Sequence, residues 1–353
     1  MSRRYAFSFL LFAALVVITL RFPALNQAAP ASTILPASPA LQPVVDAAVA
    51  KTVEQFAGKG VKSDHLAVTL VDLKDPERPA RASYRGEEQI YPASVVKMFY
   101  LAAAHRWMED GRLADTPELR RAMKDMIVES YNEATHYIID LLTDTTSGPE
   151  LSDAEIDRWF DKRNAVNGYF TTLGYTNINA SKKPWCEGPY GRETQSIKKH
   201  TPNRNLLTTD ATARLLTEIA TGHAVTPKRS AEMLALMKRD PFKKIDEGGE
   251  PDQGNAFTGL ALKDHPGAKL WSKAGWTSQT RHDAAYVELP NGARFVLVVF
   301  TTAHANERGI IESIGKAVVE HFSAKPENQC GVGSHRWPAV SKPRERSNDD
   351  DAS

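Results

Sequence analysis

The chain has few of the residues that indicate a disulfide scaffold or a metal centre. Its 353 residues include two cysteines, Cys186 and Cys330, so we expect the fold to rest on a hydrophobic core. The two could pair, but Cys330 falls in a polar C-terminal stretch, which favours two unpaired thiols. The ten histidines form no His-Glu-x-x-His or His-x-His pattern, so a metallo-hydrolase would lack its ligands and no metal is expected.

Other common functional signals are also missing. The formal net charge is +1 without a basic stripe, which gives no indication of a nucleic-acid partner. There is no Gly-x-Ser-x-Gly elbow and no P-loop, and Gly58-Lys-Gly60 follows a predicted helix, not the strand that a dinucleotide site requires. With 42% hydrophobic and 25% charged residues, the composition is that of a globular protein with one large domain or two intertwined ones.

The N-terminus has the pattern of an export signal. Arg3 and Arg4 precede an uncharged run from Tyr5 to Leu20, and Ala29-Pro-Ala31 offers a small-residue cleavage site. The run is short for a membrane span, although an uncleaved anchor remains the alternative. We therefore predict a signal peptide or N-terminal anchor over residues 1–31, and an exported protein, periplasmic or secreted, with inner-membrane anchoring left open.

Two further segments lie outside the predicted folded domain, which spans residues 41–324. Residues 32–40 continue an Ala- and Pro-rich stretch that is typical of a linker. Residues 325–353 are polar, contain proline and end in an acidic run, which predicts a disordered tail.

The order of the predicted elements indicates the architecture. The ends of the domain hold helices at 41–57 and 306–322 and strands at 65–73, 80–84, 269–276, 281–289 and 294–302. Between them, helical patterns dominate: from Ser94 to about Gly111, then 117–129, 133–142, 153–164, 208–221 and 227–238. We predict an α+β, α-β-α sandwich fold, in which the N- and C-terminal helices cover an antiparallel sheet and an all-helical lobe, about 115–238, is inserted. Periodicity is missing from 166 to 207, a loop length that is usually functional.

The strongest chemical signal is at the start of the helix that follows Tyr91. From Gln89 to His105 the only certain charge is Lys97, and a helix that is apolar nearly all round is a buried helix. A buried lysine is costly unless it is paired or its pKa is lowered. Ser94 lies three residues before Lys97, so both side chains share one helix face. The pair has the outline of an activated nucleophile.

Structural explanations for the same residues remain open. Serine is a common N-cap, and lysine usually extends its amine to water. The spacing recurs at Ser196 and Lys199, in a polar stretch that we predict to be a loop. The uncharged surroundings of Lys97 are what distinguish the first pair from the second.

Two more motifs follow in order. Ser130-Tyr131-Asn132 interrupts a helical pattern, and Lys273-Ala274-Gly275 lies at the end of a predicted strand, where small residues let a ligand approach the backbone. Taken alone, Ser130 could cap the next helix and Lys273 could protect an edge strand. The three motifs gain weight because they occur together.

The trio resembles the signatures of class A serine β-lactamases and the related penicillin-binding peptidases, Ser-x-x-Lys, Ser-Asp-Asn and Lys-Thr-Gly. The resemblance spans roughly Leu41 to Phe322. It implies that Ser94 attacks a lactam carbonyl, that Lys97 takes its proton directly or through water, and that Ser130 protonates the leaving nitrogen. It further implies that Asn132 holds a substrate amide, Lys273 and Arg281 hold the carboxylate, and the backbone N–H groups of Ser94 and Trp276 form the oxyanion hole.

The chain departs from this pattern in several places. Tyr131 replaces an aspartate, and Ala274 replaces a threonine or serine whose hydroxyl usually helps to bind the carboxylate; Thr277 or Ser278 could take its place. No Glu-x-x-Leu-Asn match supplies the deacylating glutamate. The nearest candidate is Glu187, in Trp185-Cys-Glu-Gly-Pro, with Glu193 second.

We therefore predict an exported β-lactamase-like serine hydrolase that is a monomer and needs no metal or cofactor. Its expected partner is a small-molecule β-lactam or a peptidoglycan-like peptide, with no nucleic acid and no membrane contact except through an uncleaved anchor. One alternative is a D-alanyl-D-alanine peptidase or related amidase. The other is a penicillin-binding sensor or scaffold that does not hydrolyse its ligand.

Overall fold

A six-stranded antiparallel sheet forms the centre of the molecule. The computed structural model describes residues 35–185, 188–200, 204–244 and 252–324. The strands are β1 (Leu66–Asp72), β2 (Ala80–Tyr84), β3 (Lys238–Arg239), β4 (Lys269–Trp276), β5 (Arg281–Glu288) and β6 (Arg294–Thr301). Their spatial order is β2-β1-β6-β5-β4-β3, so the first and last parts of the domain meet where β1 pairs with β6.

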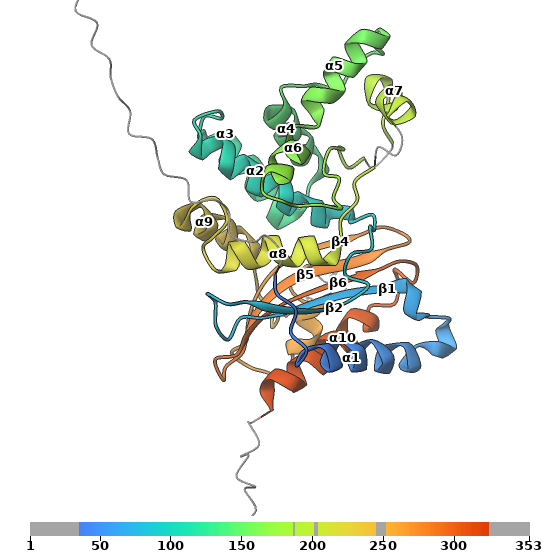
Figure 1. Cartoon of the computed structure of the whole chain (residues 1–353), viewed down its shortest axis with the longest axis vertical. Helices are drawn as coiled ribbons and strands as arrows, with labels where there is room; N and C mark the ends of the chain where they lie inside the picture. Colours follow the sequence, from blue (N-terminus) through green and yellow to red (C-terminus); the bar gives the residue numbers. More distant parts are fainter. Residues whose placement is uncertain (1–34, 186–187, 201–203, 245–251, 325–353) are drawn as a thin grey trace, which may run out of the picture.

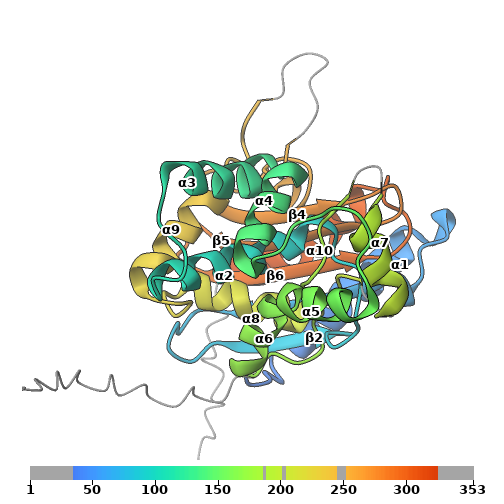
Figure 2. The ribbon, with the colours of Figure 1, turned by 90° about the horizontal axis from the view of Figure 1, so that it is seen from above.

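Helices cover both faces of this sheet. The α-helices within the described residues are α1 (Gln42–Gln55), α2 (Lys97–Glu109), α3 (Pro117–Lys124), α4 (Asn132–Thr143), α5 (Asp153–Arg163), α6 (Ala165–Thr172), α7 (Gly191–Lys199), α8 (Thr209–Ala220), α9 (Pro227–Met237) and α10 (Gly309–Ser323). Figure 1 shows α1 and α10 on one face, and α8, α9 and the lobe of α2 to α7 on the other. Seen from above, the helical lobe lies over the sheet (Figure 2).

The helix starts follow from local sequence. α3, α8 and α9 each begin after a threonine whose hydroxyl accepts the backbone N–H three residues later: Thr116, Thr208 and Thr226. α5 begins with a capping box between Ser152 and Glu155. The β5–β6 hairpin turns at Pro290-Asn291-Gly292, where Gly292 has a φ of 88°.

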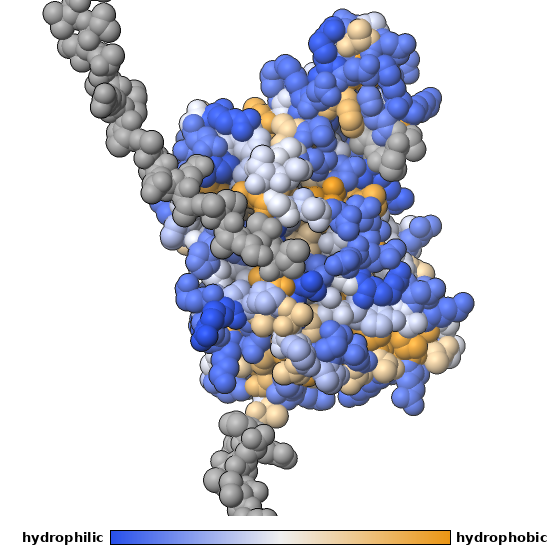
Figure 3. All heavy atoms as spheres, in the orientation of Figure 1, coloured by the Kyte–Doolittle hydropathy of each residue, from blue (hydrophilic) through white to orange (hydrophobic). Residues whose placement is uncertain are grey.

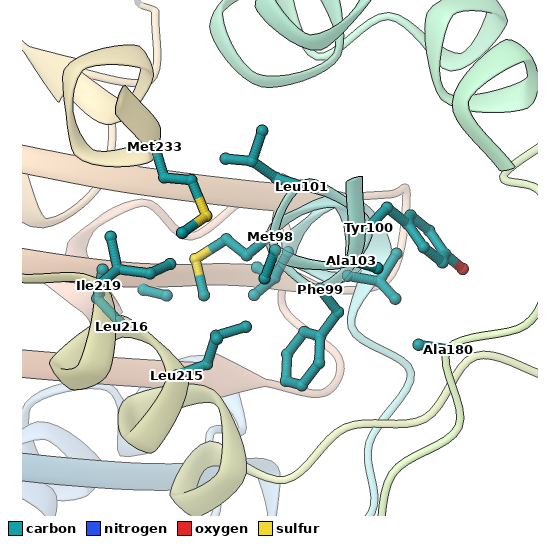
Figure 4. Close-up of a cluster of buried hydrophobic side chains, with 14 of the residues drawn as sticks. Met98, Phe99, Tyr100, Leu101, Ala103, Ala180, Leu215, Leu216, Ile219 and Met233 are labelled. Atoms are coloured by element: carbon teal, nitrogen blue, oxygen red, sulfur yellow. The ribbon is translucent and has the colours of Figure 1, made fainter. Parts of the chain in front are cut away.

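Alternate residues of the strands fill two separate cores. In β6, Val296, Val298 and Phe300 face the helical lobe, whereas Phe295, Leu297 and Val299 face α1 and α10. α2 runs through the first core and is buried nearly all round, as its sequence predicted. Figure 4 shows Met98 directed toward Met233 of α9 and Leu216 of α8, with Tyr100 on the opposite side of the helix. The face seen in Figure 3 is mostly hydrophilic, with small separated apolar patches.

The predicted fold class is confirmed, with local differences inside the helical lobe. The segment from 166 to 207, predicted to lack regular structure, contains most of α6 and the whole of α7. The predicted helix 117–129 changes to a π-helix, η4, over Asp125–Glu129. Residues 36–38, in the predicted linker, hydrogen-bond to Arg81 of β2. Within the ranges that the structure describes, no helix is both long and apolar enough to cross a bilayer. The predicted signal segment 1–31, the tail 325–353 and both cysteines lie outside the described residues.

Candidate active site

Ser94 lies on a strained turn at the start of α2. A short 3₁₀ segment, η3 (Ala93–Val96), precedes α2, and Ala93 has a positive φ of 46°. A residue with a β-carbon rarely adopts this conformation, and such strain is concentrated at functional sites. The turn leaves Ser94 partly exposed while its neighbours Ala93 and Val95 are buried. Ser94 is therefore partly accessible to solvent, while the residues on either side of it are held in the core.

The structure brings four of the predicted side chains into one hydrogen-bonded cluster: Lys97, Ser130, Asn132 and Lys273. Lys97 is fully buried one helical turn after Ser94. Its Nζ donates to the Ser130 carbonyl oxygen at 2.6 Å, to Asn132 Oδ1 at 2.9 Å and to Ser130 Oγ at 3.3 Å. Polar acceptors thus compensate for the burial of this amine.

Ser130 owes its position to the end of the π-helix. It follows η4 directly and has a left-handed conformation, with φ 63° and ψ 30°. A single π turn inside helical structure is rare and is found mostly at functional sites. The next residue, Tyr131, begins α4 as its N-cap and has a side chain that is 56% exposed. The distorted junction directs Ser130 toward both lysines and turns Tyr131 to solvent.

Lys273 reaches the same serine from β4. Its Nζ donates to Ser130 Oγ at 3.0 Å, to Gln253 Oε1 at 2.9 Å and to its own neighbour's carbonyl, that of Ala274, at 2.7 Å. Burial, together with nearby Lys97 and Arg239, holds the pKa of Lys273 well below its usual range. An anionic group bound beside Lys273 would stabilise the protonated, positively charged form of its amine.

Gln253 is a site residue that the sequence did not reveal. Its Oε1 accepts from Lys273 Nζ and from the Ala274 N–H, and its Nε2 donates to the Val128 carbonyl of η4 at 2.9 Å. It therefore joins β4 to the π-helix that positions Ser130. It lies in an aperiodic stretch, and a lone glutamine there carries no recognisable motif.

The rest of the third motif packs tightly against the nucleophile turn. A β-carbon added to Gly275 would lie 2.7 Å from the Ser94 nitrogen and 2.8 Å from the Pro92 oxygen, so only glycine allows this approach. Ala274 is fully buried and its side chain packs in the core toward α1 and α10, away from Lys273. Trp276 is 50% exposed at the end of β4. Thr277 is engaged in the turn that follows, by contacts with Gln279 and Thr280.

Arg281 is not brought into the cluster. Its guanidinium donates to the carbonyls of Ala305 and Ala256, at 2.8 and 3.3 Å, and lies over the ring of Phe257. Arg281 is buried on the face of β5 that α10 covers, whereas the next residue, His282, lies on the other face. A contact with a substrate carboxylate stays a prediction. Arg281 contacts Ala256 and Phe257, and Lys273 contacts Gln253. The chain segment from Gln253 to Phe257 therefore links the two side chains.

The structure describes one of the two candidate glutamates. Glu187 lies outside the described residues. Glu193 is buried on α7, where its Oε1 accepts from Ser147 Oγ and Arg163 Nη2, both at 2.9 Å. Arg163 also binds Asp140, which lies on α4 about 12 Å along the helix axis from Asn132. Glu193 is therefore part of a buried ion cluster, and its role as the second candidate base stays a prediction.

This ion cluster gives a stability prediction. Replacing Arg163 with leucine leaves the fully buried Glu193 without its closest cation, so we expect the free energy of unfolding to fall by about 3–5 kcal/mol. Urea unfolding measures this change. Lys162→Leu is the matched control because its ion pair with Asp144 is exposed, and its loss should stay within about 1 kcal/mol. Equal midpoints for the two variants would contradict the assigned role.

Solved structures of similar fold include β-lactamases and PBP-A. A β-lactamase from Sphaerobacter thermophilus matches at a TM-score of 0.56 and 21% identity, over 81% of this chain and 99% of its own. PBP-A matches at 0.56 and 19% identity, over 82% and 98% of the two chains. A β-lactamase from Xanthomonas campestris matches at 0.57 and 17% identity, over 78% and 98%. At these identities the likeness establishes the fold.

The sequence itself supplies the family. No curated protein sequence matches the chain. A family model, that of the beta-lactamase enzyme family, matches residues 114–322, which is more than half of the chain. These residues include the second and third motifs and the strands that carry Lys273 and Arg281. The chain therefore belongs to the beta-lactamase enzyme family.

Proposed function

We propose that this protein is an exported serine hydrolase of the class A β-lactamase type, which opens the β-lactam ring through an acyl-enzyme on Ser94. The observation that carries the proposal is the convergence of two buried lysines, from α2 and β4, on one serine hydroxyl beside the Ser94 turn. A fold alone does not define a reaction, but this arrangement gathers two amines near the turn that carries the candidate nucleophile.

In the acylation step, Ser94 Oγ attacks the lactam carbonyl and its proton passes to Lys97, directly or through a water. Collapse of the tetrahedral intermediate breaks the C–N bond, and Ser130 gives its proton to the leaving nitrogen. Ser130 Oγ accepts hydrogen bonds from both lysines, so its own hydrogen is left to point toward a third group. A lysine then restores the proton to Ser130.

Backbone N–H groups stabilise the oxyanion in this proposal. Ser94 and Trp276 are the donors, and the close packing of Gly275 on the Ser94 nitrogen supports their convergence. Asn132 holds the side-chain amide of the substrate. Lys273 holds the substrate carboxylate. The negative carboxylate would stabilise the protonated amine of Lys273, which the surroundings of that amine disfavour. Arg281 is the second predicted carboxylate ligand.

Deacylation requires a base, and we assign it to Glu187. The residues on either side support this position. The Trp185 ring lies 4.4 Å from the ring of His136, which is one turn after Asn132 on α4. The rings of Trp185 and Tyr190 are 5.6 Å apart. In the sequence, Glu187 falls between these two aromatic residues, and the first of them contacts the helix that carries Asn132.

The peptidase alternative has an observation in its favour. PBP-A resembles the chain as closely as the β-lactamases do, and a single-residue mutant of PBP-A was solved as an acyl-enzyme complex with penicillin G. A penicillin-binding protein of this kind would acylate without fast turnover. The distinction therefore rests on the rate of deacylation.

A chromogenic cephalosporin separates the possibilities. We expect the protein to hydrolyse many equivalents, with a steady rate after the first turnover. A single burst equal to the enzyme concentration would favour the peptidase or the sensor. Absence of any reaction, with a folded protein, would overturn the proposed function.

A further inference from the structure

His282 lies at the centre of a second arrangement behind the nucleophile. It is fully buried on β5, on the same face of the sheet as the cluster, and its ring packs 4.6 Å from the ring of Phe300. Its Nε2 lies 2.9 Å from the carbonyl oxygen of Tyr91, and its Nδ1 lies 3.1 Å from the backbone nitrogen of Thr301. Both ring nitrogens are therefore engaged with backbone groups.

These two contacts define the tautomer of the ring. The Thr301 N–H can only donate, so Nδ1 must be the acceptor and the proton resides on Nε2. Nε2–H then donates to the Tyr91 oxygen. Burial lowers the pKa of His282 to about 4, which agrees with a neutral ring whose second nitrogen has no room for a proton. The contact to Tyr91 is therefore constant at neutral pH.

Tyr91 is the point at which the chain enters the strained turn. Pro92 and Ala93 follow it, and then Ser94; the positive φ of Ala93 persists only if its surroundings hold it. On the other side of the turn, Gly275 packs against the Pro92 oxygen and the nitrogens of Ser94 and Val95. Gly275 and His282 are direct cross-strand partners of β4 and β5. The cross-strand pair of Gly275 and His282 thus contacts the turn twice: His282 at Tyr91 and Gly275 at Ser94.

We propose that His282 is a positioning residue for Ser94: its Nε2–H fixes the Tyr91 carbonyl and so holds the Ala93 turn in the geometry that presents Ser94 beside β4. The consequence for chemistry rests on the proposed function. The hydroxyl and the Ser94 N–H both depend on this turn, and a displacement of about 1 Å can cost roughly 100-fold in rate.

Two variants separate this role from simple packing. In His282→Gln, the amide nitrogen can occupy the place of Nε2 and donate to Tyr91. In His282→Asn, the amide oxygen can occupy the place of Nδ1 and accept from Thr301, but nothing reaches Tyr91. Both lose the ring and its packing on Phe300, so their stabilities should be similar. They differ in the contact to the turn.

The first measurement is amide hydrogen exchange across residues 91–97. We expect faster exchange in His282→Asn than in His282→Gln and the unchanged protein. The second is the acylation rate constant at saturating cephalosporin, where the asparagine variant should be about 10–100-fold slower with little change in KM. The glutamine variant should stay within a few-fold of the unchanged protein.

The outcomes are distinguishable from those of the proposed function. Equal exchange and equal acylation in both variants would overturn the role of His282, even if the enzyme is an active β-lactamase. If exchange differs as expected but the unchanged protein does not react with any β-lactam, the positioning role stands and the proposed function fails. Equal losses of acylation and stability in both variants would mean that His282 only packs, which also overturns the proposal.

Discussion

Ser94→Ala is expected to abolish acylation by a cephalosporin, with a loss of roughly 10⁶-fold or more in the rate constant, since removal of a catalytic serine has effects of this size. The physical reason is that the two lysines and Ser130 are buried or hydrogen-bonded to one another, so none of them can replace the partly exposed Ser94 as the nucleophile. Stopped-flow absorbance with a chromogenic cephalosporin measures the change.

Ser196→Ala is the matched control for this substitution. Ser196 has the same Ser-x-x-Lys spacing, but it is buried on α7, next to the ion cluster of Glu193 and Arg163. Its replacement should leave the acylation rate within a few-fold. If Ser94→Ala still acylates, or if Ser196→Ala does not, the nucleophile has been assigned to the wrong serine.

Glu187→Gln is expected to leave acylation intact and to slow deacylation by about 10²–10⁴-fold, the usual contribution of a general base. The amide keeps the size of the side chain but cannot take a proton from water. The acyl-enzyme should therefore accumulate, and intact-protein mass spectrometry should detect it long after the substrate is mixed in.

A neighbouring carboxylate provides the control. Glu133 is exposed in the first turn of α4, beside Asn132, and Glu133→Gln removes the same charge near the site without removing the base. This variant should deacylate normally. Unchanged turnover in Glu187→Gln would place the base elsewhere. A wild-type protein that already stalls would favour the peptidase or the sensor.

Much of the architecture could be predicted because its signal is apolar periodicity. In β6, successive apolar residues face the two cores in turn, and in α2 apolar residues lie on nearly every side of the helix. Both patterns can be recognised from the residue types alone. The lone Lys97 was informative for the same reason: a charge in a helix with no exposed face must have partners, and the structure supplies them from Ser130 and Asn132.

The remaining features depend on contacts that sequence patterns do not encode. α7 was predicted as a loop because its buried residues, Glu193 and Ser196, are polar, and Glu193 is satisfied by an ion cluster from other helices. Gln253 and His282 likewise act through backbone groups more than a hundred residues away. The sequence also did not show on which face of the sheet Ala274 lies, whereas in the structure the pleat of β4 directs its side chain into the core.

The most direct test of the central proposal is to locate the acylated residue. The Glu187→Gln variant, in which the acyl-enzyme should accumulate, is incubated with benzylpenicillin, quenched in acid, digested with trypsin and mapped by mass spectrometry. Cleavage after Arg85 and Lys97 releases Ser94 in the peptide 86–97, and cleavage after Arg192 and Lys198 releases Ser196 in the peptide 193–198. We predict one adduct, with the mass of intact benzylpenicillin, on Ser94 of the first peptide. An adduct on any other peptide, or none on a folded protein, would contradict the account.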